Sequence, residues 1–500
     1  MMEISFENMT VDCLKQLRQE VRSEEQTQEV RLSESMPDVG KVLGAWGQPL
    51  IRSKQWQGNA VSVSGGVMVW ILYTPEDGSA VQSVETWVPF QMRWDLPDSQ
   101  RDGTITVCCN LRGIDARSTS PRKIMARINL SMMLQAMEPV QVGVPQSVKL
   151  PEDVLLRREA YPVQIPSEAG EKPFMMDEEL NLPGSCPPVA KLLRYCLQPE
   201  LIDKKVMADK VVFRGMAILR LVYAAEDGGV KTWDFEIPFS QYAELEREHG
   251  NGSQCAVIPV LTSMELDTEG ESRIRLKAGL TGQYMIYDTV PVEAVTDAYS
   301  TRRQVTVQKQ QIPLPILLEM RRELRHVEQT LDRPARQAVD TALYGCHPAL
   351  RRQAEGRELT MEGLLQTLFY DEEGKIQCAV SRWEDRWMMD AGEDVRIDGV
   401  AMAAGMSQAT AGGGRLESRG DMAAELFTMD EKGLEMVTGL ELGELTTADP
   451  GRPTLLLRRA GEQTLWELAK ETGSTEEAIR SANGLSGEPE HGKMLLIPVL

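Results

Sequence analysis

The stretch VSVSGGVMVWILYTPEDGSAVQSVETWVPF, residues 61–90, returns further along the chain as VVFRGMAILRLVYAAEDGGVKTWDFEIPF, residues 211–239. The matching positions lie 150 residues apart: Gly65 and Gly215, Tyr73 and Tyr223, Glu76 and Glu226, Asp77 and Asp227, Gly78 and Gly228. Pro89-Phe90 returns as Pro238-Phe239, one residue short of that offset. A divergent third copy at 358–374 keeps Gly363, Tyr370 and Gly374 in the same places. Such a period far exceeds the roughly 20–50 residues of a solenoid repeat, so it indicates a duplicated domain.

Each copy carries the two-residue period of β-strands. In 211–223 every second residue from Val211 to Tyr223 falls on one face, and the other face is polar only in places. Both copies then have an acidic turn with glycine, EDG, which is typical of a β-hairpin. A further hairpin is predicted in each copy, over 104–114 with 123–132 and over 254–266 with 272–286. Each copy is therefore predicted to be a mostly antiparallel β domain.

Short helices are also expected near the start of each copy. The segments PDVGKVLGAW, 37–46, and PPVAKLLRYC, 187–196, place apolar residues at positions i, i+3 and i+4 after a proline that a first helical turn tolerates. The segment PLPILLEMRRELRHV, 313–327, shows helical spacing as well and leads into the third copy. The glycine-rich stretch at 401–416 lacks the spacing of a phosphate-binding loop and is interpreted as a flexible loop.

The last residues form a different, smaller unit. Composition changes at ADPGRP, 448–453, which is interpreted as a linker. After it we expect a strand at 454–459, two short helices and a return strand at 494–499. Leu465, Leu468 and Ala469 should face inward from the first helix, and Ala478, Ile479 and Ala482 from the second. Ser474 and Glu477 form a capping-box pattern that would open the second helix, and Asn483-Gly484 would close it.

The predicted fold class is therefore mainly β with short helices. The expected domains are three tandem repeated antiparallel β domains at 1–160, 161–312 and 313–448, the third degenerate, followed by a small β-α-α-β module at 452–500.

Composition restricts the classes of partner. The chain has 54 Lys and Arg against 75 Asp and Glu, a net charge of −21, so it would repel nucleic acid and anionic lipid. No apolar run approaches the length of a membrane span, and the first twenty residues carry charges where a signal peptide needs an apolar core, so a cytoplasmic protein without direct membrane insertion is expected. The eight cysteines are scattered without a C-x-x-C pair, which favours reduced thiols over disulfides.

Catalytic patterns are missing from the sequence. The four histidines lie far apart without a metal-binding spacing, and there is no G-x-S-x-G elbow. The acidic pairs Glu76-Asp77 and Glu226-Asp227 are interpreted as solvated turn residues. The vicinal Cys108 and Cys109 should point to opposite faces of a strand, which argues against a shared metal site. We therefore expect no enzyme, with no catalytic, cofactor-binding or metal-binding residues.

The last 47 residues resemble a LysM module. The residues that match are Gly461, Thr464, Leu465, Trp466, Leu468, Ala469, Ser474, Thr475, Ile479, Ala482, Asn483, Leu485, Gly492, Leu495, Ile497 and Pro498. The upstream copies, with their G-x7-Y spacing, acidic glycine turn and Pro-Phe, resemble the tandem domains of the SipL-like family of clostridial spore-coat morphogenetic proteins.

This resemblance implies an adaptor in the cytoplasm of the mother cell, at the forespore surface, whose LysM module binds the morphogenetic ATPase of the spore coat or another coat protein. The alternative is binding of peptidoglycan, the N-acetylglucosamine polymer that an ordinary LysM module holds with two loops. Here the first loop, 461–465, carries an extra residue, and the second, 484–491, is shorter than the family pattern. The residues predicted to bind partner or glycan are Gly461, Glu462, Gln463, Thr464, Trp466, Asn483, Gly484 and Leu485. For Trp466, core packing and partner contact both remain open.

Overall fold

Three β units of the same design make up most of the molecule. The computed structural model describes residues 2–97, 102–270, 272–353, 356–390, 392, 394–446 and 453–500. In each unit the strands pair in two antiparallel sets: the first, sixth and fifth strands form one, and the second, third and fourth form the other. The first set of the second unit and that of the third unit join into one six-stranded sheet, through the pairing of Leu317 with Gln164. Strands dominate the chain and only two short helices occur in the described part, so the predicted fold class, mainly β with short helices, is confirmed.

The first and second β units share one continuous hydrophobic core. The strands of the first unit are β2 (Glu7–Arg31), β3 (Val39–Gln57), β4 (Ala60–Pro75), β5 (Gln82–Asp95), β6 (Thr104–Ser120) and β7 (Lys123–Ser147). Those of the second are β8 (Val154–Asn181), β9 (Val189–Met207), β10 (Lys210–Ala225), β11 (Val230–Glu244), β12 (Gln254–Glu269) and β13 (Arg273–Ser300). All four predicted hairpins are present, as β4–β5, β6–β7, β10–β11 and β12–β13.

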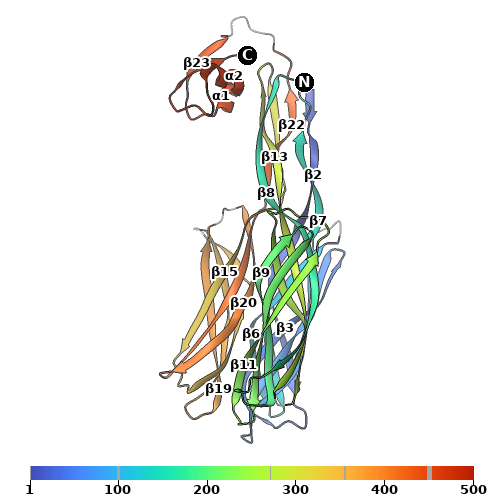
Figure 1. Cartoon of the computed structure of the whole chain (residues 1–500), viewed down its shortest axis with the longest axis vertical. Coiled ribbons are helices and arrows are strands. Elements are labelled where there is room, and N and C mark those ends of the chain that lie inside the picture. The colour runs from blue at the N-terminus through green and yellow to red at the C-terminus, as the bar shows by residue number, and fades with distance from the viewer. Residues whose placement is uncertain are drawn as a thin grey trace.

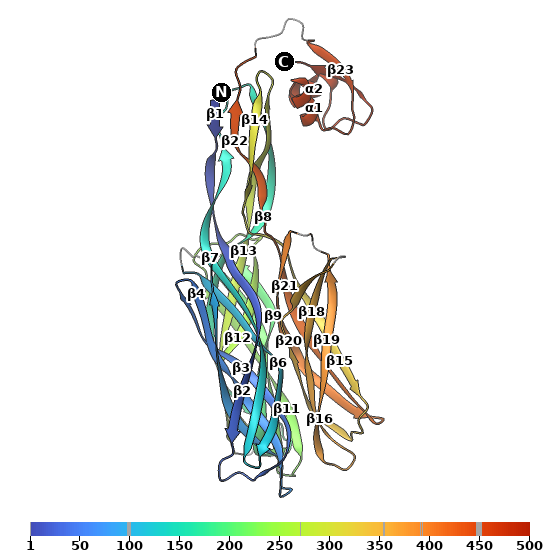
Figure 2. The ribbon, with the colours of Figure 1, turned by 180° about the vertical axis from the view of Figure 1, so that it is seen from behind.

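The third β unit forms a second lobe (Figures 1 and 2) that has a hydrophobic cluster of its own. Tyr344, Leu368 and Ile376 of this unit also join the core of the first two units. Its strands are β15 (Ile316–Leu331), β16 (Gln337–Gly345), β17 (Ala349–Gln353), β18 (Gly356–Tyr370), β19 (Ile376–Met389), β20 (Val395–Gly412) and β21 (Arg415–Asp430). Both β16 and β17 pair with β18, so together they take the place that one strand fills in the other units. The interruption between them contains His347.

The copies match in contacts as well as in sequence. Tyr73 and Tyr223 are buried, and their hydroxyls donate to the carbonyls of Pro37 and Pro187 at 3.0 and 3.2 Å. Gly65 and Gly215 pair with Phe90 and Phe239, and a Cβ at either glycine would lie within 2.2 Å of a backbone oxygen of the neighbouring strand. The repeated glycine is thus needed where two strands approach closely.

Three predicted helical segments are strands instead. Segments 37–46 and 187–196 lie at the starts of β3 and β9, and 313–327 continues into β15. In β3 and β9 the ladder register shifts around Leu43 and Leu193, two β-bulges at matching positions. A bulge turns two successive side chains toward one side, so it imitates the i, i+3, i+4 pattern of a helix. The flexible loop expected at 401–416 was also wrong for most of its length: residues 401–412 belong to a strand that pairs with the next one, and the turn is limited to Gly413 and Gly414.

A narrow stalk extends from the three units (Figure 1). It contains the outer ends of β2 with β7 and of β8 with β13, together with β1 (Met2–Ser5), β14 (Val305–Ile312) and β22 (Leu434–Leu442). All three β units contribute to its core, which includes Val11 of β2, Val292 of β13 and Ile316 of β15. The expected domain boundaries at 160/161 and 312/313 fall in this region, the first of them inside β8; the division into four domains stays a prediction.

The C-terminal module, residues 453–500, lies beside the tip of the stalk (Figure 2). It has the predicted β-α-α-β order: β23 (Leu455–Arg459), α1 (Leu465–Thr472), α2 (Glu476–Asn483) and β24 (Met494–Pro498), with β23 antiparallel to β24. Residue 452 and most of the predicted linker lie outside the described residues. Leu465, Leu468, Ala469 and Ile479 are buried, as predicted.

Two details of the module differ from expectation. The capping box is on α1, where Thr464 and Glu467 satisfy each other's backbone, and α2 is capped by Thr475 alone. Ala482 is exposed. The Ser474–Glu477 prediction was wrong by one residue, because the hydroxyl of Thr475, the next residue, accepts from the Ala478 N–H and caps the helix.

Candidate functional site

The predicted loop residues of the C-terminal module divide into exposed and structural ones. Gly461, Glu462 and Gln463 are exposed before α1, and Gln463 Nε2 donates to Glu471 Oε2 at 3.2 Å. Thr464 serves as the N-cap of α1, and Gly484 ends α2 in the left-handed conformation. The first loop therefore offers free polar surface, whereas these two residues stabilise helix ends.

Asn483 and Leu485 hold the second loop against the module. The Asn483 amide donates to the Leu496 carbonyl at 2.6 Å and accepts from the Leu496 N–H at 2.8 Å. Leu485 is half-buried against the module's hydrophobic core. Replacing Asn483 would remove both hydrogen bonds between α2 and β24. Its role in this structure is therefore to hold the end of α2 in place against β24.

Trp466 lies between the module and the stalk. It is 7% exposed, and its ring packs edge-on against Tyr299 of β13 with ring centroids 4.7 Å apart. Its Nε1 donates to Asp297 Oδ2 at 2.8 Å. Both interpretations of Trp466 therefore hold in part. Its side chain is buried, and it makes a contact, but with a distant part of the same chain.

Charge strengthens the same contact. Lys470, one turn after Trp466 on α1, places Nζ 2.7 Å from Asp297 Oδ1. The Asp297 carboxyl is partly buried, which raises its pKa, but hydrogen bonds from Lys470 and Trp466 outweigh this and leave the pKa below its ordinary value. Asp297 is therefore held as the carboxylate that both donors require.

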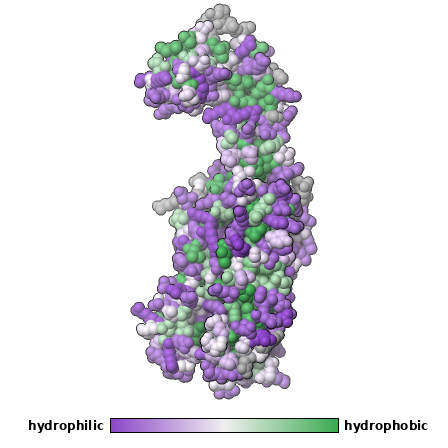
Figure 3. Space-filling model, viewed as in Figure 1, coloured by the Kyte–Doolittle hydropathy of each residue, from purple (hydrophilic) through white to green (hydrophobic). Residues whose placement is uncertain are grey.

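The two-stranded sheet of the module has an exposed apolar face. Leu455 and Leu457 of β23 are 53% and 65% exposed, and Leu457 pairs with the exposed Leu496 of β24. In the view of Figure 3, hydrophobic residues occur among hydrophilic ones along the upper edge of the module, where Figure 1 places β23. Because water-exposed leucines in register are unusual on a small two-stranded sheet, this face is a second candidate for protein contact.

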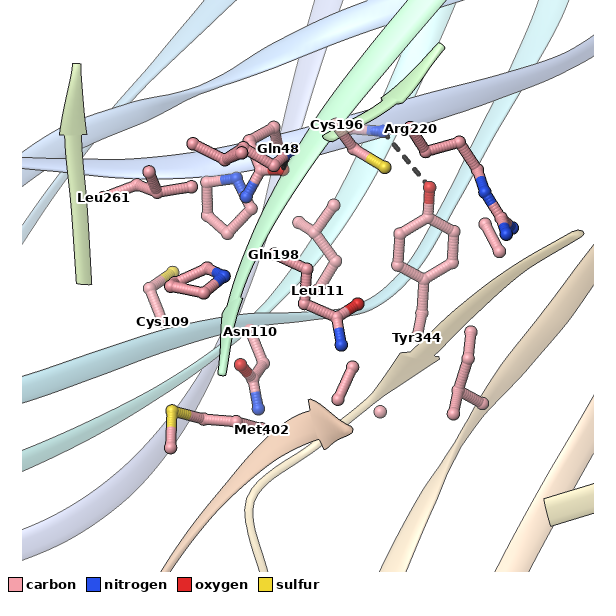
Figure 4. Close-up of a pocket in the computed structure, with 18 of the residues that line it drawn as sticks. Gln48, Cys109, Asn110, Leu111, Cys196, Gln198, Arg220, Leu261, Tyr344 and Met402 are labelled. Carbon is pink, nitrogen blue, oxygen red and sulfur yellow. Dashed lines mark hydrogen bonds between the residues drawn. The ribbon is translucent and has the colours of Figure 1, made fainter. Parts of the chain in front are cut away.

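A cavity of about 190 Å³ lies where the three β units meet. Most of its wall comes from the second and fifth strands of each unit, β3 and β6, β9 and β12, β16 and β20, with Arg220 of β10 and Met422 of β21 added. Figure 4 shows the amides of Gln48, Asn110 and Gln198 among its lining side chains. The apolar part of the wall includes Leu111 and Met402.

The polar groups of this cavity hold neighbouring units together. Gln48 Oε1 accepts from the Leu197 N–H at 3.2 Å, joining the first unit to the second. Gln198 Nε2 donates to the Gly405 carbonyl at 2.8 Å, joining the second to the third. The Gly47 N–H donates to the Tyr344 hydroxyl at 3.3 Å, the bond drawn in Figure 4, and closes the ring of contacts. We call this set of contacts between the three units, around the cavity, the joint.

A buried ion network supports one side of this joint. Asp340 of the third unit is fully buried and pairs with Arg194 and Arg220 of the second. Arg220 also forms a bidentate ion pair with Asp234, in which Nε and Nη2 donate to Oδ1 and Oδ2, each at 2.7 Å. Charge is balanced, two guanidiniums against two carboxylates, which buried ions require.

The described residues hold no group of three or more His, Cys, Asp or Glu placed to bind a metal ion. Cys108 and Cys109 lie in different hydrophobic clusters, on opposite sides of β6 as expected. No helix within the described ranges is long and apolar enough to cross a membrane.

A comparison with protein-family models matches residues 188–269 to the SPOCS domain of SipL. This segment is similar to a SipL domain. It corresponds to β9–β12 of the second β unit, which includes the repeated glycine, tyrosine and acidic turn. The match supports the resemblance to the SipL family and points to a sporulation-related protein. Comparisons with curated proteins and with solved structures gave no match.

Sequence reasoning missed Asp297 and Tyr299. They lie about 170 residues before α1 and belong to a segment, VPVEAVTDAYS, that reads as an ordinary strand. No local pattern marks them, because only the packing of the module on the stalk brings them to Trp466.

Proposed function

We propose that this protein is a non-enzymatic adaptor in spore-coat assembly, acting in the mother-cell cytoplasm at the forespore surface. Its C-terminal LysM-like module would bind the morphogenetic ATPase of the coat or another coat protein, and the β units would serve as the scaffold. The observation that carries the proposal is the similarity of residues 188–269 to the SPOCS domain of SipL.

The design of the molecule supports an adaptor. Residues that line the cavity form hydrogen bonds between the units, which suits a rigid body. The module is small and carries surfaces on two sides: the exposed first loop and the apolar face with Leu457 and Leu496. A rigid body with a separate contact module suits the tethering of one assembly to another.

Binding of the purified chain to the recombinant coat ATPase, measured by surface plasmon resonance, tests the proposal. Saturable binding is expected, and Gln463→Ala with Leu485→Ala should weaken it at least tenfold if the loops make the contact. Arg386→Ala, an exposed change in the third unit, is the matched control. Lack of binding to the ATPase by the folded wild type would contradict the proposed partner.

Peptidoglycan binding is the alternative, because the module has the strand and helix order of a LysM fold. Calorimetry with N-acetylglucosamine oligomers separates the two functions. We expect no saturable heat, since the two loops depart from the family pattern. A micromolar isotherm with a stoichiometry near one would favour the glycan.

A further inference from the structure

The contact between the C-terminal module and the stalk has the make-up of a recognition site. Trp466 and Lys470 are on one face of α1, and both bond to the single carboxylate of Asp297. The Tyr299 ring covers the indole, and its hydroxyl donates to the Ser474 carbonyl at 3.0 Å. An aromatic anchor, a charged pair and a hydrogen bond in one small patch are typical of a protein-binding hot spot.

The stalk presents its side of this contact through an irregular strand. The register of β13 against β8 shifts between Val295 and Asp297, which marks a bulge at Thr296. Bulges re-aim side chains at the ends of sheets. Asp297 and Tyr299 are therefore displayed together toward the module, with Leu155 of β8 filling the apolar edge.

The module reaches this contact along a short connection. Only residues 443–454 separate the end of β22 from the start of β23. So short a connection gives the module a high effective concentration at the stalk, about millimolar. A partner of the module therefore has to compete with a contact that the chain makes with itself.

We propose that the stalk tip is an intramolecular ligand of the module: Asp297 and Tyr299 fill the Trp466–Lys470 surface and are displaced by a partner protein that presents a carboxylate beside an aromatic ring. This inference rests on the proposed function, because it concerns how the same module is kept from its partner. The kind of partner follows from the chemistry of the stalk residues, which the partner has to replace.

Hydroxyl-radical footprinting of the full chain, with Trp466 oxidation measured by mass spectrometry, tests the contact without any partner. In the wild type the stalk should shield Trp466, so its oxidation should be slow. Asp297→Asn combined with Tyr299→Ala should raise its oxidation rate at least fivefold, and Lys470→Glu should do so from the module's side. Glu293→Gln, an exposed change on the same strand, is the control and should leave it unchanged. Circular dichroism checks that each variant is folded.

Binding of the same variants to the recombinant coat ATPase tests the masking. The Asp297→Asn/Tyr299→Ala chain should bind at least tenfold more tightly than the wild type, because the partner no longer competes with the stalk. Trp466 oxidised equally in the wild type and the stalk variant overturns the intramolecular contact. Raised oxidation with unchanged ATPase affinity overturns the masking but leaves the adaptor function standing. If no chain binds the ATPase, the proposed function fails and the footprint alone decides the contact.

Discussion

The third β unit contains a buried histidine whose protonation should destabilise the joint between units. His347 is fully buried in the interruption between β16 and β17. Its Nε2 lies 3.0 Å from the Cys108 carbonyl and its Nδ1 accepts from the Ala401 N–H at 3.1 Å. The neutral ring fits this pair of partners, because the Nδ1 proton of an imidazolium would point at a donor. Burial lowers the pKa of His347 from 6.5 to about 4.

The difference between the pKa of His347 in the unfolded chain and in the folded chain sets the sign and size of the change in stability with pH. Above pH 6.5 the ring is neutral in both states and its contribution to stability is fully present. As the pH falls from 6.5 toward 4, the unfolded chain takes up a proton that the folded chain refuses, so stability is lost. A difference of this size at ~1.4 kcal/mol per pKa unit corresponds to about 3 kcal/mol.

Urea unfolding between pH 7 and pH 4 measures this loss against a matched variant. Glutamine at position 347 can donate and accept like the neutral ring but cannot titrate, so other acid-sensitive groups cancel in the comparison. The wild type should lose about 3 kcal/mol more than His347→Gln over this range. Parallel stability profiles for the two proteins would refute the reasoning and show that His347 is solvated or already protonated.

Three further changes test the packing. Asp340→Asn leaves Arg194 without its buried counter-charge and should destabilise the body by roughly 3–5 kcal/mol in chemical unfolding; a loss under about 1 kcal/mol would contradict the buried pair. Gly65→Ala forces a Cβ to 2.1 Å from the Leu50 carbonyl oxygen and should lower the melting temperature, whereas Gly461→Ala meets open space and should not. Leu468→Ala should cost on the order of 2–5 kcal/mol and unfold the module, seen as lost amide protection in α1 and α2 with the β units unchanged; retained protection there would show that the module's core is not the source of its stability.

Several features of this protein can be predicted from its sequence because they depend on neighbouring residues. Alternation with a period of two and the turn EDG predict the hairpins β4–β5 and β10–β11, since each needs only local pairing and a glycine at positive φ. The 150-residue offset predicts that Tyr73 and Tyr223 are equivalent, and both donate to a proline carbonyl. The inward face of α1 follows in the same way from helical spacing, as does Ile479 on α2, whereas Ala482 is exposed.

The tertiary structure decides what the local pattern cannot. Segments 37–46 and 187–196 have the spacing of a helix, but β4 and β10 offer complete ladders of backbone partners, and bulges at Leu43 and Leu193 absorb the irregular spacing. The sequence likewise marks Trp466 as a candidate for core packing or partner contact, but it does not show which residues surround it. Asp297 and Tyr299 reach it only because the stalk brings the end of β13 to α1, a contact between residues far apart in the chain that depends on how the whole chain packs.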